Sequence, residues 1–154
     1  MKIIVIGHGM AGHKFLESLQ DSTSTTTRVT ILCEELRTAY DRVHLSEFFS
    51  GKSADDLALL EPGFFDRSNL VLTLNTRAVA VDRKTKTVTT AQGEKLAYDK
   101  LVFATGFTPF VSPIPGHNRK DCFVYRTIAD LEAMRECGSR SGSGIVIGGG
   151  LQAS

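Results

Sequence analysis

Residues 7–12 read Gly-His-Gly-Met-Ala-Gly and directly follow an apolar run over residues 3–6. This spacing suits a turn from a strand into a helix that carries a nucleotide. Gly7 would permit the tight turn, Gly9 would let the backbone approach a pyrophosphate, and Gly12 would permit close packing of helix on strand. A glycine-rich turn that binds no ligand can have the same sequence. The motif therefore predicts a nucleotide site only where a strand precedes it and a helix follows it.

The residues after the turn have the spacing of a helix. Apolar side chains within residues 10–20 recur on one helical face, and a polar Ser/Thr run over residues 21–27 closes the segment. The free N–H groups of the first turn, at Met10 and Ala11, would then receive the phosphates. The glycine motif therefore lies between a predicted strand and a predicted helix, as nucleotide binding requires.

Two acids follow the second predicted strand, which covers residues 28–33. Glu34 and Glu35 lie 22 and 23 residues after Gly12, close to the roughly 20 residues that place a carboxylate on a ribose hydroxyl. The spacing leaves open which acid binds the ribose, and the other is then a solvated surface charge. Together with the glycine motif, these acids predict a dinucleotide site.

The rest of the chain alternates short β-branched runs with segments of helical spacing, which is typical of α/β architecture. We expect a Rossmann-type parallel sheet with helices on both faces and an inserted antiparallel β-meander. A capping box, Thr127 to Asp130, predicts a helix that runs to about Cys137. The further predicted strands cover residues 70–74, 77–82, 87–90, 101–104 and 145–147.

Composition excludes several classes of protein. The 154 residues are 42% hydrophobic and 23% charged, with a net charge of +1, so nothing indicates a nucleic-acid partner. The amino-terminal apolar run is too short for a signal peptide or a membrane span, and we expect a cytoplasmic protein. Cys33, Cys122 and Cys137 are too scattered for a disulfide framework, a CxxC pair or a four-thiolate iron–sulfur cluster.

Four stretches carry a family resemblance. They are Cys-Glu-Glu at 33–35, Ala-Tyr-Asp-Arg-Val-His-Leu-Ser at 39–46, Tyr-Asp-Lys-Leu-Val-Phe-Ala-Thr-Gly at 98–106, and the run at 124–131 that begins Val-Tyr-Arg-Thr-Ile. Together they resemble the amino-terminal region of the large subunit of NAD(P)H nitrite reductase. The run from Tyr40 to Ser46 is the most specific. The glycine motif and the Ala-Thr-Gly end are shared with ferredoxin and rubredoxin reductases and the wider two-dinucleotide-binding flavoproteins.

The resemblance implies an FAD site. In such proteins a glycine loop binds the diphosphate, an acid binds the adenosine ribose, an arginine lies near the diphosphate, and the Ala-Thr-Gly segment packs beside the cofactor. A guanidinium matches phosphate oxygens bidentately, although an ion pair of Arg42 with Asp41 or Glu47 is the alternative. The residues implied are Gly7, Gly9, Met10, Ala11, Gly12, Glu34 or Glu35, Arg42, Ala104, Thr105 and Gly106, with Val79 offering backbone contacts to adenine.

The resemblance also implies a domain division. Residues 1–115 would form an FAD-binding domain without its carboxyl-terminal return segment, and residues 116–154 would begin an NAD(P)H-binding domain. Gly148, Gly150 and Ala153 fit the start of a second glycine motif, which the chain leaves incomplete. We expect weak or no FAD retention and no turnover from the chain alone, and exposed apolar surface would favour a homodimer.

In the intact parent, the resemblance implies that NAD(P)H passes hydride to FAD. Electrons then reach iron–sulfur and siroheme centres, carried elsewhere in the parent, that reduce nitrite to ammonia. The alternatives are a fragment of a rubredoxin or ferredoxin reductase or an NADH oxidase, and a non-catalytic interaction module. The chain lacks the CxxxxC motif of the disulfide-reducing flavoproteins.

The histidines are expected to have no direct role. His8 occupies a variable position of the glycine motif, and His13, His44 and His117 have no metal-binding spacing. The pairs Phe48-Phe49 and Phe64-Phe65 are expected to lie in the core or at an interface.

Overall fold

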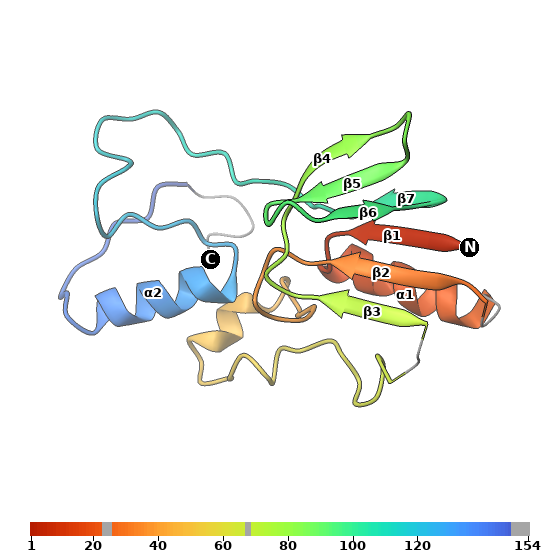
Figure 1. Ribbon diagram of the computed structural model, residues 1–154. Helices are drawn as coiled ribbons and strands as arrows, with labels where there is room; N and C mark the ends of the chain where they lie inside the picture. The colour runs from red at the N-terminus through yellow and green to blue at the C-terminus, as the bar shows by residue number, and fades with distance from the viewer. Residues whose placement is uncertain (23–25, 67–68, 149–154) are drawn as a thin grey trace.

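The computed structural model describes residues 1–22, 26–66 and 69–148 and contains two sheets (Figure 1). The larger sheet has four strands in the order β3-β2-β1-β7, and every neighbouring pair is parallel. The predicted α/β class and its central parallel sheet are therefore confirmed. The strands are β1 (Lys2–Ile6), β2 (Arg28–Leu32), β3 (Leu70–Thr73) and β7 (Lys100–Phe103).

Strand β1 is buried on both faces, which explains its unbroken apolar run. Ile3 and Val5 share a core with Leu16 of helix α1 (Met10–Ser22). Ile4 and Ile6 face the opposite way and pack with residues of the second sheet. Successive side chains of a strand point to opposite faces, so one strand contributes to two cores. Each fully buried side chain of this kind contributes about 1.5–3 kcal/mol.

The second sheet is the predicted antiparallel meander. It consists of β4 (Ala78–Asp82), β5 (Thr87–Thr90) and β6 (Lys95–Ala97) in that order. Val88 is fully buried against β1. In the described residues, the meander covers the face of the parallel sheet opposite α1, where the prediction had a helix. A strand with alternating apolar residues offers an equally apolar face, so the meander can replace a helix there.

A third core lies at the carboxyl ends of the parallel strands (Figure 1). Helix α2 (Ile128–Gly138) begins with the predicted capping box, in which Thr127 and Asp130 exchange hydrogen bonds. It packs on the segment that includes the 3-10 helix η1 (Leu45–Phe48). The buried members of this core are Tyr40, Leu45, Phe48, Leu57, Ile128 and Leu131. The region after residue 115 therefore supports the segment that carries Arg42, while the predicted domain boundary stays a prediction.

One predicted strand is wrong. Residues 145–147 form no strand, and the three side chains are exposed. No strand in the described residues lies beside them to pair with their backbone groups. Gly150 and Ala153 of the predicted second glycine motif fall outside the described residues. Neither described helix is long and apolar enough to cross a membrane.

Candidate functional site

The predicted glycine turn lies where β1 and β7 end, at the carboxyl edge of the parallel sheet. The N–H of Gly7 donates to the carbonyl of Leu32 at 2.8 Å, and the N–H of Ala104 donates to the carbonyl of Ile6 at 2.8 Å. Gly7 has a φ of +102°, and a Cβ there would lie 2.3 Å from the Ala104 oxygen. The close approach of these two strand ends therefore requires glycine at position 7.

The first turn of α1 is held against the same edge and stays open above Gly9. A Cβ on Gly12 would lie 2.5 Å from the Gly7 oxygen, whereas a Cβ on Gly9 would meet only the Nε atom of Arg42, at 3.9 Å. The first turn contains no acidic side chain, and its N–H groups at Met10 and Ala11 have no acceptor within the helix. This arrangement leaves room and free donors for an anion.

Arg42 brings a guanidinium to this open space. Its side chain is only 20% exposed and forms an ion pair with Glu35. Its Nη1 donates to the carbonyl of Arg126 at 3.1 Å, and the guanidinium carbon lies 4.8 Å from the centre of the Tyr40 ring. The alternative ion pairs with Asp41 or Glu47 are not formed. Arg42 is thus fixed from three sides beside Gly9.

The two candidate acids have different surroundings. The Glu35 carboxylate pairs with Arg42 and accepts a 2.8 Å hydrogen bond from the hydroxyl of Tyr40. Burial, together with this hydrogen bond, raises the pKa of Tyr40, so its hydroxyl keeps the proton that it donates. Glu34 is 65% exposed and faces Arg77 at 3.3 Å. The geometry connects Glu35, through Arg42, with the glycine turn.

Arg126 is a site residue that the sequence reasoning missed. A Cβ on Gly106, where φ is +68°, would lie 3.1 Å from an Nη atom of Arg126. The Arg126 guanidinium carbon lies 3.8 Å from the centre of the Phe107 ring. The signal was present, because Arg126 lies within the run over residues 124–131 that carries part of the resemblance. Arg126 thus brings a second guanidinium to the end of β7, while its backbone carbonyl accepts from Arg42.

Of the remaining predicted residues, Ala104 and Thr105 lie against the glycine turn and Val79 stands apart from it. The Thr105 nitrogen would be 3.1 Å from a Cβ on Gly7. The pairing of β4 with β5 shifts register at Val79, and its side chain is exposed. No described contact brings Val79 to the glycine turn, so its contact with adenine stays a prediction.

Residues 1–154 match the family model described as pyridine nucleotide-disulphide oxidoreductase. The chain belongs to this family. The glycine turn and Ala104, which follows β7, are thus parts of a flavoprotein-type fold.

Two similar proteins are large subunits of nitrite reductases. The chain is 44% identical over 152 residues to the NADH nitrite reductase large subunit of Escherichia coli, which covers 98% of this chain and 18% of that relative. It is 45% identical over 150 residues to the NAD(P)H nitrite reductase large subunit of Klebsiella oxytoca, covering 97% of this chain and 16% of that relative. A ferredoxin reductase of Rhodopseudomonas palustris matches with a TM-score of 0.81 at 25% identity, covering 90% of this chain and 34% of that one.

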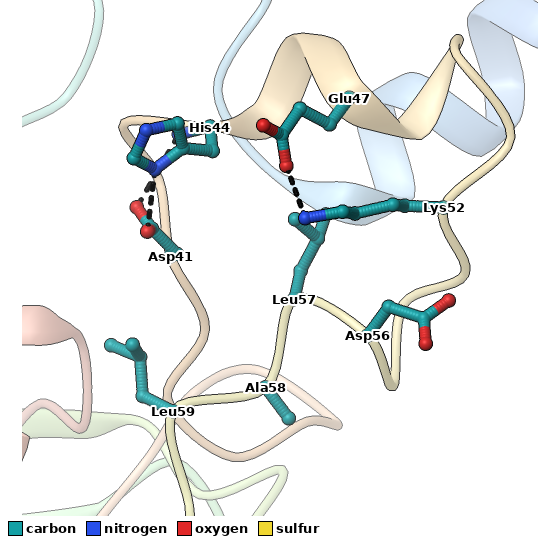
Figure 2. Close-up of a pocket in the computed structure, with 8 residues that line it drawn as sticks. All are labelled: Asp41, His44, Glu47, Lys52, Asp56, Leu57, Ala58 and Leu59. Carbon is teal, nitrogen blue, oxygen red and sulfur yellow. Dashed lines mark hydrogen bonds and ion pairs between the residues drawn. The ribbon is translucent and has the colours of Figure 1, made fainter.

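A separate hollow of about 340 Å³ lies beside η1 (Figure 2). Its wall carries two ion pairs, His44 with Asp41 at 2.7 Å and Lys52 with Glu47. The hydrogen bond to Asp41 raises the pKa of His44. No residue of the glycine turn lines this hollow, and its remaining charged side chain, Asp56, accepts hydrogen bonds from Ser53. The hollow is therefore separate from the predicted nucleotide site at the glycine turn.

His8, the second residue of the glycine turn, is buried and only 4% exposed. Its Nδ1 accepts a hydrogen bond from the N–H of Ala39 at 3.1 Å, and its Nε2 has no partner. Burial, and secondarily the neighbouring His13, lower the pKa of His8 from 6.5 to about 4. The folded protein therefore holds this imidazole neutral at pH values where the unfolded chain is protonated.

This difference predicts an acid-dependent loss of stability. Between pH 6.5 and 4 the unfolded state binds a proton that folded His8 refuses, so the free energy of unfolding falls as pH falls, by about 3 kcal/mol from this group. Above pH 6.5 the group contributes no pH dependence. Denaturant unfolding at pH 7, 5.5 and 4 should show a shallower decline in His8→Asn than in wild type. Equal declines in the two proteins would contradict the buried neutral imidazole.

Proposed function

We propose that this chain is the FAD-binding part of an NAD(P)H-dependent nitrite reductase large subunit. The names of the relatives at 44% and 45% identity and the family match support this proposal. The chain spans under one fifth of the length of those two relatives. The whole protein would act in the cytoplasm, taking hydride from NAD(P)H onto FAD and reducing nitrite to ammonia.

One observation carries the cofactor proposal: the open space above Gly9, bordered by free helix amides and by the Arg42 guanidinium. A diphosphate needs several N–H donors and positive charge, and both are present without a competing acid in the helix's first turn. The residues therefore fit FAD. When bound, FAD supplies the hydride and electron-transfer chemistry, and the protein supplies its placement.

The proposed binding roles follow from these contacts. The amides of residues 9–12 and the guanidinium of Arg42 hold the diphosphate, and Glu35 accepts hydrogen bonds from the adenosine ribose. Arg126 and the segment Ala104 to Gly106 border the cofactor on the side of β7. Gly7 and Gly12 permit the close packing that places these groups together, and Val79 contributes backbone contacts to adenine.

The remaining parts of the enzyme belong to the rest of the parent protein. We assign residues 1–115 to an FAD-binding domain and residues 116–154 to the start of an NAD(P)H-binding domain, with iron–sulfur and siroheme centres elsewhere in the parent. Exposed Phe103, Phe107 and Phe110 give this chain an apolar surface that suits contact with the parent or with a second copy in a homodimer.

The second candidate is the flavoprotein part of a ferredoxin reductase, and the likeness to the Rhodopseudomonas palustris structure favours it. The two candidates differ in the electron acceptor. The intact parent should consume nitrite in the presence of NADH or NADPH and form ammonia. Reduction of a ferredoxin without nitrite consumption would favour the second candidate and contradict the first.

A matched pair of variants tests the ribose assignment. We expect Glu35→Gln to weaken FAD binding about tenfold, because a charged hydrogen-bond acceptor is lost, and Glu34→Gln to change it less than about twofold, because Glu34 is a solvated surface charge. Isothermal titration of each variant with FAD measures the difference. Equal losses in the two variants, or a loss only in Glu34→Gln, would contradict the assignment.

A further inference from the structure

His8 connects the glycine turn with the segment that carries Arg42. The ring points into the protein, where it lies 5.5 Å from Phe65 and 5.8 Å from His13, measured between ring centres. Its Nδ1 accepts from the N–H of Ala39 at 3.1 Å. Both residues are buried, since Ala39 is 1% exposed. This contact is thus shielded from water and spans 31 positions of the sequence.

The segment that begins at Ala39 is held on its other side by residues 57–59. The Ala39 carbonyl accepts from the N–H of Leu59 at 3.0 Å, and the N–H of Asp41 donates to the Leu57 carbonyl at 2.8 Å. The N–H of Ala39 points instead toward the glycine turn. His8 therefore satisfies a buried donor that would otherwise have no partner, and buried donors are rarely left so.

The direction of this hydrogen bond fixes the tautomer of the neutral His8 imidazole. Because Nδ1 accepts, the neutral ring carries its proton on Nε2, which lies buried without a partner. An apolar residue at position 8 would remove the unpaired Nε2 atom, but it would leave the buried N–H of Ala39 without an acceptor. The acceptor atom, and not only the volume of the ring, is therefore what histidine supplies here.

We propose that His8 is a positioning residue that sets the distance between the glycine turn and the Arg42 guanidinium by holding Ala39. The inference rests on the proposed function, since the space so defined is the one assigned to the diphosphate of FAD. Arg42 lies three residues after Ala39, and its Nε would be 3.9 Å from a Cβ on Gly9. Loss of the hydrogen bond frees this end of the segment and widens or disorders that space.

Three variants separate positioning from packing. Asn at position 8 offers an acceptor where Nδ1 lies now, Gln places its acceptor one bond farther out, and Leu fills similar volume with no acceptor. We expect the dissociation constant for FAD to rise about tenfold in His8→Leu and His8→Gln, and to stay within about threefold of wild type in His8→Asn. Titration of the 154-residue chain with FAD measures these constants.

The second readout needs no cofactor. The Ala39 amide should exchange with deuterium faster in His8→Leu and His8→Gln than in wild type or His8→Asn, as followed by NMR. Equal Ala39 protection in all four proteins overturns the proposal, as does equal FAD affinity in the three variants. The protein could also show the predicted exchange pattern without binding FAD. That outcome would support the hydrogen bond between His8 and Ala39 and contradict the proposed FAD site. If His8→Leu fails to fold, the comparison of Asn with Gln still decides.

Discussion

Gly7→Ala is expected to destabilise the protein by about 4 kcal/mol or more, which would lower the melting temperature of a chain of this length by about 10 °C or more. Two costs combine. An L-residue at a φ of +102° costs about 1–2 kcal/mol. The added Cβ would also lie 2.3 Å from the Ala104 oxygen, and because both atoms are fixed by strands β1 and β7, a backbone shift is required.

Gly51→Ala is the matched control for this variant. Gly51 has nearly the same backbone angle, with a φ of +105°, but a Cβ there meets nothing within 4 Å. It should therefore cost only the conformational term, about 1–2 kcal/mol. Thermal unfolding followed by circular dichroism compares the two. Similar losses in both variants would show that the close approach of β1 and β7 at Gly7 is not what requires glycine.

Arg42→Ala is expected to weaken FAD binding about 10- to 100-fold. A hydrogen bond to a charged group contributes about 1.5–3 kcal/mol. The substitution also removes the contacts that the partly buried guanidinium makes with Tyr40 and the Arg126 carbonyl. Arg42→Lys should lie between Arg42→Ala and wild type, because lysine keeps the charge without the planar fork. Titration with FAD measures all three.

Arg77→Ala separates this effect from a general loss of positive charge. Arg77 also pairs with a glutamate, Glu34, but its side chain is 66% exposed and lies outside the glycine turn. We expect its FAD affinity to stay within about twofold of wild type. An Arg42→Ala protein that is folded and binds FAD as well as wild type would remove Arg42 from the diphosphate site. So would an equal loss of affinity in Arg77→Ala.

The parts of the fold with a regular apolar period could be predicted from the sequence. The run at β1, the helical face of α1 and the alternation in β4 and β5 each report a local pattern that burial enforces. The capping box at Thr127 could also be predicted, because it depends on two residues that lie three positions apart in the sequence. The strand predicted over residues 145–147 was wrong because a strand needs a partner, and a short apolar run does not reveal one.

The candidate site was predicted only in part, for a similar reason. The glycines and Arg42 were recognisable from motifs, whereas the choice between Glu34 and Glu35 depended on where Arg77 and Tyr40 lie in space. Arg126 comes 84 residues after Arg42, and no local spacing shows that its carbonyl accepts from that guanidinium. The buried hydrogen bond of His8 was likewise hidden in a position of the motif that tolerates many side chains.

The most direct test of the account is the binding of nucleotides to the purified chain, measured by isothermal titration with FAD, ADP and FMN. The residues brought together at the carboxyl edge of the sheet suit a diphosphate and an adenosine ribose. We therefore predict that added FAD binds at micromolar to millimolar concentration, too weakly to be retained through purification, that ADP competes with it, and that FMN binds far more weakly. Binding of FMN as tight as that of FAD, or no binding of FAD at millimolar concentration, would contradict the account.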